Sequence, residues 1–276
     1  MNIDSMIDGL EKAAAESIRA KEGDYYGDDG LLYCGNCKTK KQTRVNILGK
    51  ERTPFCLCRC EAEKRDREEA ERKRIEFERR VKELRRTGFP ESDMQEWTFA
   101  NDDGENSKIM TVAKNYVDNF GKMREDGKGL LFFGPVGTGK TYAAACIVNA
   151  LIDKGCPCMM AKISDIADGI FKGKFTCHDF NSYPLLVLDD LAAERKTEYM
   201  QEIVYNVIDA RCRANLPLII TTNLTADELK HPADITNQRT FSRLFEMCIP
   251  IEITGDDRRR KKLKEDFNTY KDILGI

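Results

Sequence analysis

The chain has 276 residues, of which 41% are hydrophobic and 33% are charged. That length suits one well-buried core plus a small accessory module. The net charge of −2 does not single out a nucleic-acid-binding protein, and no apolar run reaches the roughly 18 residues that a membrane span needs. The N-terminus lacks the basic start, apolar centre and small-residue cleavage site of a signal peptide, so we expect a cytoplasmic protein with no membrane partner.

Residues 1–60 are expected to hold a short N-terminal helix and a metal-binding module. Two cysteine groups lie within this segment, at Cys34-x-x-Cys37 and at Cys56-Leu-Cys58-Arg-Cys60. Two thiolate pairs separated by a loop are typical of a tetrahedral Zn²⁺ site, whereas reducing conditions disfavour disulfides. We favour Cys34, Cys37, Cys58 and Cys60 as the ligands, with Cys56 as the substitute. Buried thiols or a redox pair are the alternatives, but so short a segment could hardly bury these thiols in its own core.

Residues 61–90 are expected to form a charged linker helix. Glu and Arg or Lys recur at helical i, i+4 spacing, and Gly88-Phe89-Pro90 ends the pattern. A thin apolar stripe runs along it at Ile75, Phe77, Val81 and Leu84. A solvated connector is one interpretation, and an arm that binds a partner or forms a coiled coil is the other.

From residue 91 to residue 276, short apolar runs alternate with helical patterns. Such alternation predicts an α/β domain with a parallel sheet covered by helices on both faces, and a ligand at the carboxyl ends of the strands. The expected strands are residues 129–133, 158–163, 185–188, 218–222 and 249–253. Helices are expected over residues 139–152 and 196–214.

Residues 134–141, GPVGTGKT, match the phosphate-loop pattern G-x-x-x-x-G-K-[ST]. The glycines let successive backbone N–H groups converge on phosphate oxygens, Lys140 would neutralise the β- and γ-phosphates, and the Thr141 hydroxyl would bind Mg²⁺. An ordinary glycine-rich turn is the alternative, but the match follows an apolar strand and opens a helix, as ATP binding requires. The predicted nucleotide-binding residues here are Gly134, Pro135, Val136, Gly137, Thr138, Gly139, Lys140, Thr141 and Tyr142.

A second acidic motif follows the apolar run Leu185–Leu188. Asp189 would hold Mg²⁺ together with Thr141, and Asp190 would orient or deprotonate the attacking water. Two acids after a strand could also form a turn or a helix cap. Their combination with the upstream phosphate loop favours the catalytic interpretation.

Taken in order, GPVGTGKT, LLVLDDL, IITTNLT, SRLFEM and GDDRR resemble the DnaC/IstB-like branch of the AAA+ ATPases. The resemblance covers about residues 95–262 and implies a P-loop AAA+ fold. It also implies that Asn223 is the polar sensor-1 residue and that Arg243 is an arginine finger acting on a neighbouring subunit. Either Arg258 or Arg259 matches the sensor-2 arginine, with Arg259 slightly favoured, and the segment Trp97-Thr98-Phe99 is expected against the adenine.

For Arg243 and Asn223, general chemistry offers both support and an alternative. Arginine suits the charge of a phosphoryl transition state, and an amide at a strand tip suits the γ-phosphate. Arg243 could instead form a surface salt bridge, and Asn223 could be a turn residue. Asp190 stands where many AAA+ proteins have the longer Glu, so slow hydrolysis is expected.

The resemblance implies a helicase loader in DNA replication. Its implied partners are a replicative DnaB-type helicase, single-stranded DNA and a second copy of the chain through Arg243. Several loaders of this type carry a small N-terminal zinc module, which would grip the helicase. Basic residues at 258–264 are candidates for DNA contact, with Phe267 and Tyr270 as stacking residues. An IstB-like transposition helper and a nucleotide-gated adaptor with negligible turnover are the competing hypotheses.

Overall fold

A computed structural model describes residues 20–47, 49–104, 107–191, 198–232 and 234–275. The chain divides into two compact units, Met1–Phe77 and Glu78–Ile276. The short helix expected at the N-terminus lies outside the described residues. No described helix has the length and apolar content needed to cross a membrane.

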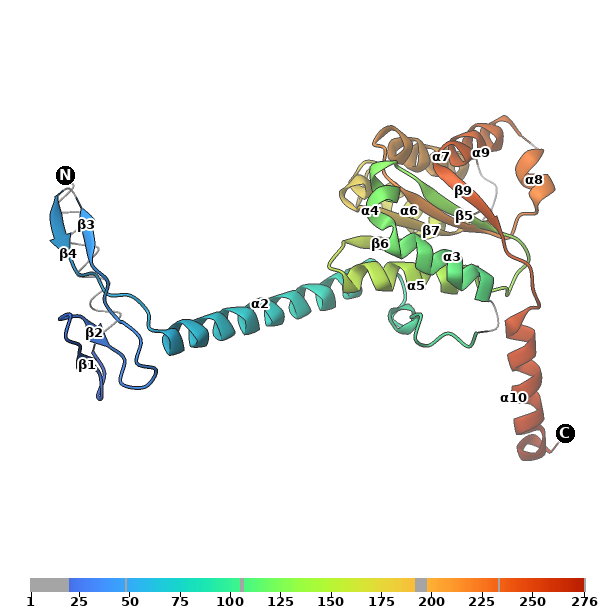
Figure 1. Cartoon of the computed structure of the whole chain (residues 1–276). Coiled ribbons are helices and arrows are strands. Elements are labelled where there is room, and N and C mark those ends of the chain that lie inside the picture. Colours follow the sequence, from blue (N-terminus) through green and yellow to red (C-terminus); the bar gives the residue numbers. More distant parts are fainter. Residues whose placement is uncertain (1–19, 48, 105–106, 192–197, 233, 276) are drawn as a thin grey trace. The chain divides into compact units, whose positions relative to one another are not determined.

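The first unit is small and has little apolar core. Two antiparallel hairpins pair β1 (Tyr25–Tyr26) with β2 (Leu32–Tyr33), and β3 (Val45–Ile47) with β4 (Lys50–Arg52) (Figure 1). Among the described residues of this unit, the buried apolar and sulfur-containing side chains are Leu31, Leu32, Cys34 and Cys58. A core of this size rarely stabilises a fold without metal ions or cross-links.

Helix α2 (Arg59–Gly88) is the charged helix that the sequence indicates. Its ion pairs include Lys73 with Glu69 at 2.7 Å and Lys64 with Glu68 at 3.7 Å, and all four side chains are exposed. Pairs of this kind stabilise a helix by only about 0.3–0.5 kcal/mol each. The helix ends at Gly88, where a Cβ would lie 2.8 Å from the carbonyl oxygen of Cys158, so a glycine allows the close packing there.

The second unit contains a five-stranded parallel sheet in the order β6-β7-β8-β5-β9. The strands are β5 (Gly129–Phe133), β6 (Cys158–Lys162), β7 (Leu185–Leu191), β8 (Leu218–Thr222) and β9 (Cys248–Glu252). The α-helices are α3 (Ser107–Asp118), α4 (Phe120–Glu125), α5 (Lys140–Asp153), α6 (Ile163–Phe171), α7 (Glu198–Arg213), α8 (Ala226–Lys230), α9 (Ile235–Met247) and α10 (Arg258–Leu274). Two 3₁₀ turns are η1 (Asp93–Glu96) and η2 (Asp179–Ser182).

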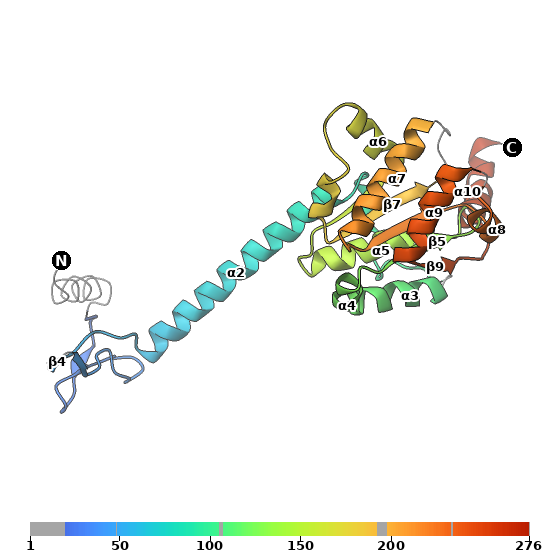
Figure 2. The ribbon, with the colours of Figure 1, turned by 90° about the horizontal axis from the view of Figure 1, so that it is seen from above.

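Helices cover both faces of the sheet. Alternate residues of β5 point to opposite faces, so Leu130 and Phe132 join one core while Leu131 and Phe133 join the other. Helices α3 and α5 pack on the first face, and α6, α7 and α9 on the second (Figures 1 and 2). Val81 and Leu84 of α2 pack against the first core, whereas Ile75 and Phe77 are exposed. The fold is the helix-flanked parallel sheet that the sequence predicts.

Candidate functional site: a phosphate pocket and a four-cysteine cluster

A cavity of about 600 Å³ opens at the carboxyl ends of β5, β7 and β8. All its lining residues belong to the second unit. They are Glu91, Met94, Trp97, Asn101, Asp103, Val136, Gly137, Thr138, Gly139, Lys140, Thr141, Tyr142, Lys162, Asp189, Asp190, Thr221, Asn223, Arg258 and Arg259. The cavity therefore joins the predicted phosphate loop to the predicted acidic and sensor residues.

The loop between β5 and α5 has the backbone that its glycines permit. Gly134, Gly137 and Gly139 all have positive φ, at 129°, 79° and 92°. A Cβ on Gly134 would lie 2.3 Å from the carbonyl oxygen of Ile253, which leaves no room for a side chain. Gly139 immediately precedes the first residue of α5, so the N-terminus of this helix faces the cavity with its positive dipole end.

Lys140 is buried against the backbone of this loop. Its Nζ donates to the carbonyl oxygens of Gly134 at 2.9 Å and Pro135 at 2.6 Å. Burial lowers the pKa of Lys140, while the charges of Asp190 and Asp189 oppose that shift. Among the described residues, no carboxylate lies within ion-pair distance of Nζ. A buried ammonium held by neutral carbonyls fits an anionic ligand such as a phosphate.

Asp189, buried at the end of β7, is held by two hydroxyl groups. Thr141 and Thr221 donate to its Oδ1 at 2.9 and 2.6 Å. Burial raises the pKa of Asp189, and these two hydrogen bonds oppose that shift. A buried carboxylate beside a threonine hydroxyl offers the hard oxygen ligands that Mg²⁺ prefers, so the residues present fit this ion.

Asp190 has a left-handed backbone, with φ at 63°, at a register shift between β7 and β8. Its backbone N–H donates to Thr221 Oγ1 at 2.9 Å, and its Oδ1 accepts from Asn223 Nδ2 at 2.9 Å. The predicted base and sensor residues therefore lie in direct contact. Thr221, which the sequence reasoning missed, contacts both acidic residues; only its place in the strand before Asn223 could have indicated it.

The start of α10 lies against the phosphate loop. Arg258 N donates to the carbonyl oxygen of Gly137 at 3.1 Å, and Asp257 caps the helix by accepting from Arg259 N at 3.0 Å. Both sensor-2 candidates, Arg258 and Arg259, line the cavity. Arg258 also forms an ion pair with Asp103, another lining residue that the sequence reasoning missed.

Four residues of the predicted nucleotide site do not line this cavity: Phe99, Arg243, Gly134 and Pro135. Phe99 packs against the first core, with Lys114 Nζ 5.7 Å from its ring centroid. Trp97 of the same segment does line the cavity, and its ring lies 5.8 Å from that of Tyr142. Arg243, on α9, pairs with Asp209 at 3.2 Å and Glu246 at 2.8 Å. Gly134 and Pro135 do not line the cavity, and their carbonyl oxygens accept hydrogen bonds from Lys140.

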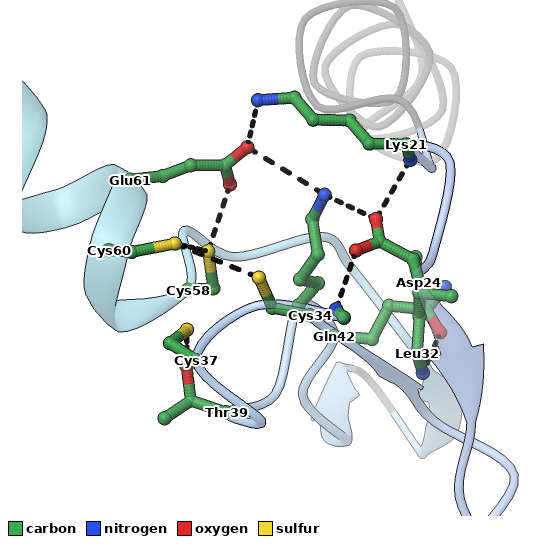
Figure 3. Close-up of polar contacts among 12 residues, drawn as sticks. Lys21, Asp24, Leu32, Cys34, Cys37, Thr39, Gln42, Cys58, Cys60 and Glu61 are labelled. Atoms are coloured by element: carbon green, nitrogen blue, oxygen red, sulfur yellow. Dashed lines mark hydrogen bonds and ion pairs between the residues drawn. The ribbon is translucent and has the colours of Figure 1, made fainter.

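The four favoured cysteines come together in the first unit (Figure 3). The sulfur atoms of Cys34, Cys37, Cys58 and Cys60 all lie within 4.8 Å of one another. Zn–S bonds of about 2.3 Å place tetrahedral sulfurs about 3.8 Å apart, so this cluster fits Zn²⁺. Cys56 is outside the group, and its sulfur lies 3.7 Å from the carbonyl oxygen of Lys40.

A network of charged side chains lies beside the cluster, as Figure 3 shows. Lys41 is fully buried, and its Nζ lies 2.7 Å from Asp24 and 3.7 Å from Glu61. Burial lowers the pKa of Lys41, but the contacts with Asp24 and Glu61 outweigh it and raise this pKa overall. Glu61 in turn accepts from the Cys58 thiol at 3.3 Å and pairs with Lys21 at 2.6 Å. The network ties residues 21–24 and the first turn of α2 to the cysteines.

Comparison with known proteins gives a match over residues 130–246 to the family described as ATPase family associated with various cellular activities (AAA). The replicative helicase loader DnaI of Bacillus subtilis is 24% identical in an alignment of length 208, and the match covers 68% of this chain and 66% of DnaI. The replicative helicase loader DnaC of Escherichia coli is 27% identical in an alignment of length 145, and that match covers 49% of this chain and 56% of DnaC. The chain thus spans somewhat less than two thirds of the first relative and just over half of the second.

Among solved structures, the crystal structure of DnaI matches with a TM-score of 0.50 and 25% identity. This match covers 63% of the present chain and 96% of that structure. The cavity geometry, the family match and these relatives agree. We conclude that residues 130–246 match the AAA ATPase family and that the chain is similar to the replicative helicase loaders DnaI and DnaC.

Proposed function

We propose that this protein binds Mg²⁺-ATP in the cavity at the carboxyl edge of the sheet and acts as a replicative helicase loader. One observation carries the nucleotide proposal. Five residues from the start of α5, the end of β7 and the loop after β8 line one cavity: Lys140, Thr141, Asp189, Asp190 and Asn223. The names of the relatives support the loader role.

In the proposed site, the phosphate-loop amides and Lys140 bind the phosphates. Thr141 and Asp189 are the residues that would hold Mg²⁺, which neutralises phosphate charge when it is bound. Thr221 keeps Asp189 oriented. Trp97 and Tyr142, which line the same cavity, supply apolar surface for the base.

Hydrolysis is assigned to Asp190, assisted by Asn223. The amide of Asn223 orients the Asp190 carboxylate, which accepts a proton from the attacking water. Asp reaches one methylene less far than Glu, so we expect turnover to be slow. Asp190→Asn should abolish turnover and spare binding. An unchanged rate in a phosphate-release assay would refute this role.

Partner binding is assigned to the parts outside the cavity. We take residues 1–60 as a zinc module, 61–90 as a linker helix and 91–276 as the ATPase domain. The zinc module and linker would bind the DnaB-type helicase, and the C-terminal basic segment would contact single-stranded DNA. Arg243 would complete the site of a neighbouring copy in the cytoplasm.

Co-purification with the replicative helicase of the source organism, with and without ATP, tests the loader proposal. Wild type and Lys140→Ala are compared, since the lysine variant should lose nucleotide binding. A helicase complex that depends on nucleotide state in wild type alone supports the proposal. Absence of any complex under both conditions contradicts the loader role, and intact nucleotide binding in Lys140→Ala contradicts the site.

A further inference from the structure

Asp103 places a carboxylate in a cavity that the proposed function assigns to an anionic ligand. Its side chain is about half exposed and forms an ion pair with Arg258, whose side chain is 24% exposed. Both residues line the cavity beside Gly137, Gly139 and Lys140. The contact of this carboxylate with Arg258 therefore bears on how a phosphate would bind in the cavity.

The position of Arg258 over the phosphate loop is fixed by the backbone. Its N–H donates to the carbonyl oxygen of Gly137, and the Asp257 cap orients the first turn of α10. A Cβ built on Gly139 would lie 3.1 Å from an Arg258 guanidinium nitrogen. The guanidinium therefore lies directly above the loop whose amides would bind phosphate oxygens, and within reach of them.

A carboxylate and a phosphate are alternative partners for the same guanidinium, since both accept its paired N–H donors. Asp103 also carries a negative charge that repels a polyphosphate at short range. We propose that Asp103 is a built-in competitor for Arg258, which exchanges its carboxylate partner for a nucleotide phosphate when the nucleotide binds. Asp103 thereby sets the nucleotide affinity below what the loop and the arginine alone would give. This inference rests on the proposed nucleotide site.

The full chain is titrated with a fluorescent ATP analogue in the presence of Mg²⁺. Asp103→Asn keeps the size of the side chain and removes its charge, so the analogue should bind more tightly, by about 3- to 5-fold for a half-exposed ion pair. Arg258→Gln should weaken binding. In Arg258→Gln, the further change Asp103→Asn should have a much smaller effect, because the contested partner is gone. Asp126→Asn is the matched control, since Asp126 pairs with Lys122 on α4 and does not line the cavity.

Weaker binding in Asp103→Asn would overturn the inference, because it would make Asp103 a support for Arg258 or for the ligand. An equal gain with and without Arg258 would also overturn the exchange, leaving only general charge repulsion. Lys140→Ala separates this inference from the proposed function. If that variant binds the analogue like wild type, the nucleotide site itself is wrong; if it loses binding while Asp103→Asn fails to tighten it, only the competition is wrong.

Discussion

Thr221 contacts both acidic residues of the cavity, Asp189 at its carboxylate and Asp190 at its backbone N–H. One hydroxyl donates to Asp189 Oδ1 at 2.6 Å and accepts from Asp190 N at 2.9 Å. It therefore stabilises the ionised form of a carboxylate whose pKa burial raises, and it holds the left-handed backbone of Asp190. Thr221 can in this way govern the carboxylate that we propose as a ligand of Mg²⁺.

We expect Thr221→Val to raise the Mg²⁺ concentration needed for half-maximal ATPase activity by about 10-fold or more, as loss of an outer partner of a metal ligand does. It should also lower the free energy of unfolding by about 1–3 kcal/mol, because two buried polar groups lose a partner. Mg²⁺ titrations and urea unfolding measure the two effects. Thr221→Ser retains the hydroxyl and should behave like wild type in Mg²⁺; if it fails as valine does, the methyl group matters instead.

The sequence predicts those site residues that lie within contiguous motifs. GPVGTGKT fixes the glycines, Lys140 and Thr141 by local backbone needs, and the spacing of the cysteines favours the four that the structure brings together. Contacts between distant segments could not be read in this way. The Asp103–Arg258 pair joins two distant segments, and the burial of Lys41 depends on Asp24 and Glu61 folding around it. No local sequence pattern indicates either the Asp103–Arg258 pair or the burial of Lys41.

At the scale of elements, the strands were the most predictable part. The runs 129–133 and 218–222 coincide with β5 and β8, because strands buried on both faces are continuously apolar. β7 continues past the expected Leu188 to Leu191, since Asp189 still pairs with Lys162 of β6 and Leu191 with Thr222 of β8. The apolar run is therefore shorter than the strand, because the strand continues through the two acidic residues.

The first turn of α10 contributes both to the stability of this helix and to the position of Arg258 at the cavity. Asp257 accepts from Arg259 N at 3.0 Å and Arg260 N at 3.4 Å, and the same turn holds Arg258 against Gly137. Asp257→Ala should cost about 1 kcal/mol as a lost N-cap and should weaken nucleotide binding as well. Asp234→Ala removes the equivalent cap of α9, where Asp234 accepts from Asn237 N at 2.7 Å, away from the cavity.

Thermal unfolding and analogue titration of both variants provide the measurement. We expect similar losses of stability and a loss of affinity only in Asp257→Ala. Equal affinities in the two variants would show that the α10 cap has no part in ligand binding.

At the scale of the whole molecule, the two units depend on different sources of stability. Among its described residues, the first has few buried apolar side chains, and four of its cysteines lie together in one cluster. The second has two extended apolar cores, and every residue that lines the cavity belongs to it. Metal binding should therefore matter to one unit far more than to the other.

Removal of Zn²⁺ from the full chain, with a chelator selective for Zn²⁺ over Mg²⁺ and with Mg²⁺ present throughout, should expose the amides of residues 25–52 to hydrogen exchange. Exchange in the sheet and the affinity for an ATP analogue should stay unchanged. Hydrogen-exchange mass spectrometry and titration measure both, and re-addition of Zn²⁺ is the control for reversibility. Protection of residues 25–52 that survives complete metal removal would show that the cysteine cluster is not what holds this unit together.

The ion pairs of Arg243 with Asp209 and Glu246 have a consequence for how copies of this chain would work together. If Arg243 serves a neighbouring site, it must first leave both carboxylates, so a lone chain keeps this group neutralised. Docking of a neighbour with bound nucleotide then supplies the replacement partner, and assembly and hydrolysis become linked steps. Turnover per chain should accordingly rise with protein concentration while nucleotide affinity does not, so that copies meeting on a shared target hydrolyse ATP and dispersed ones remain idle.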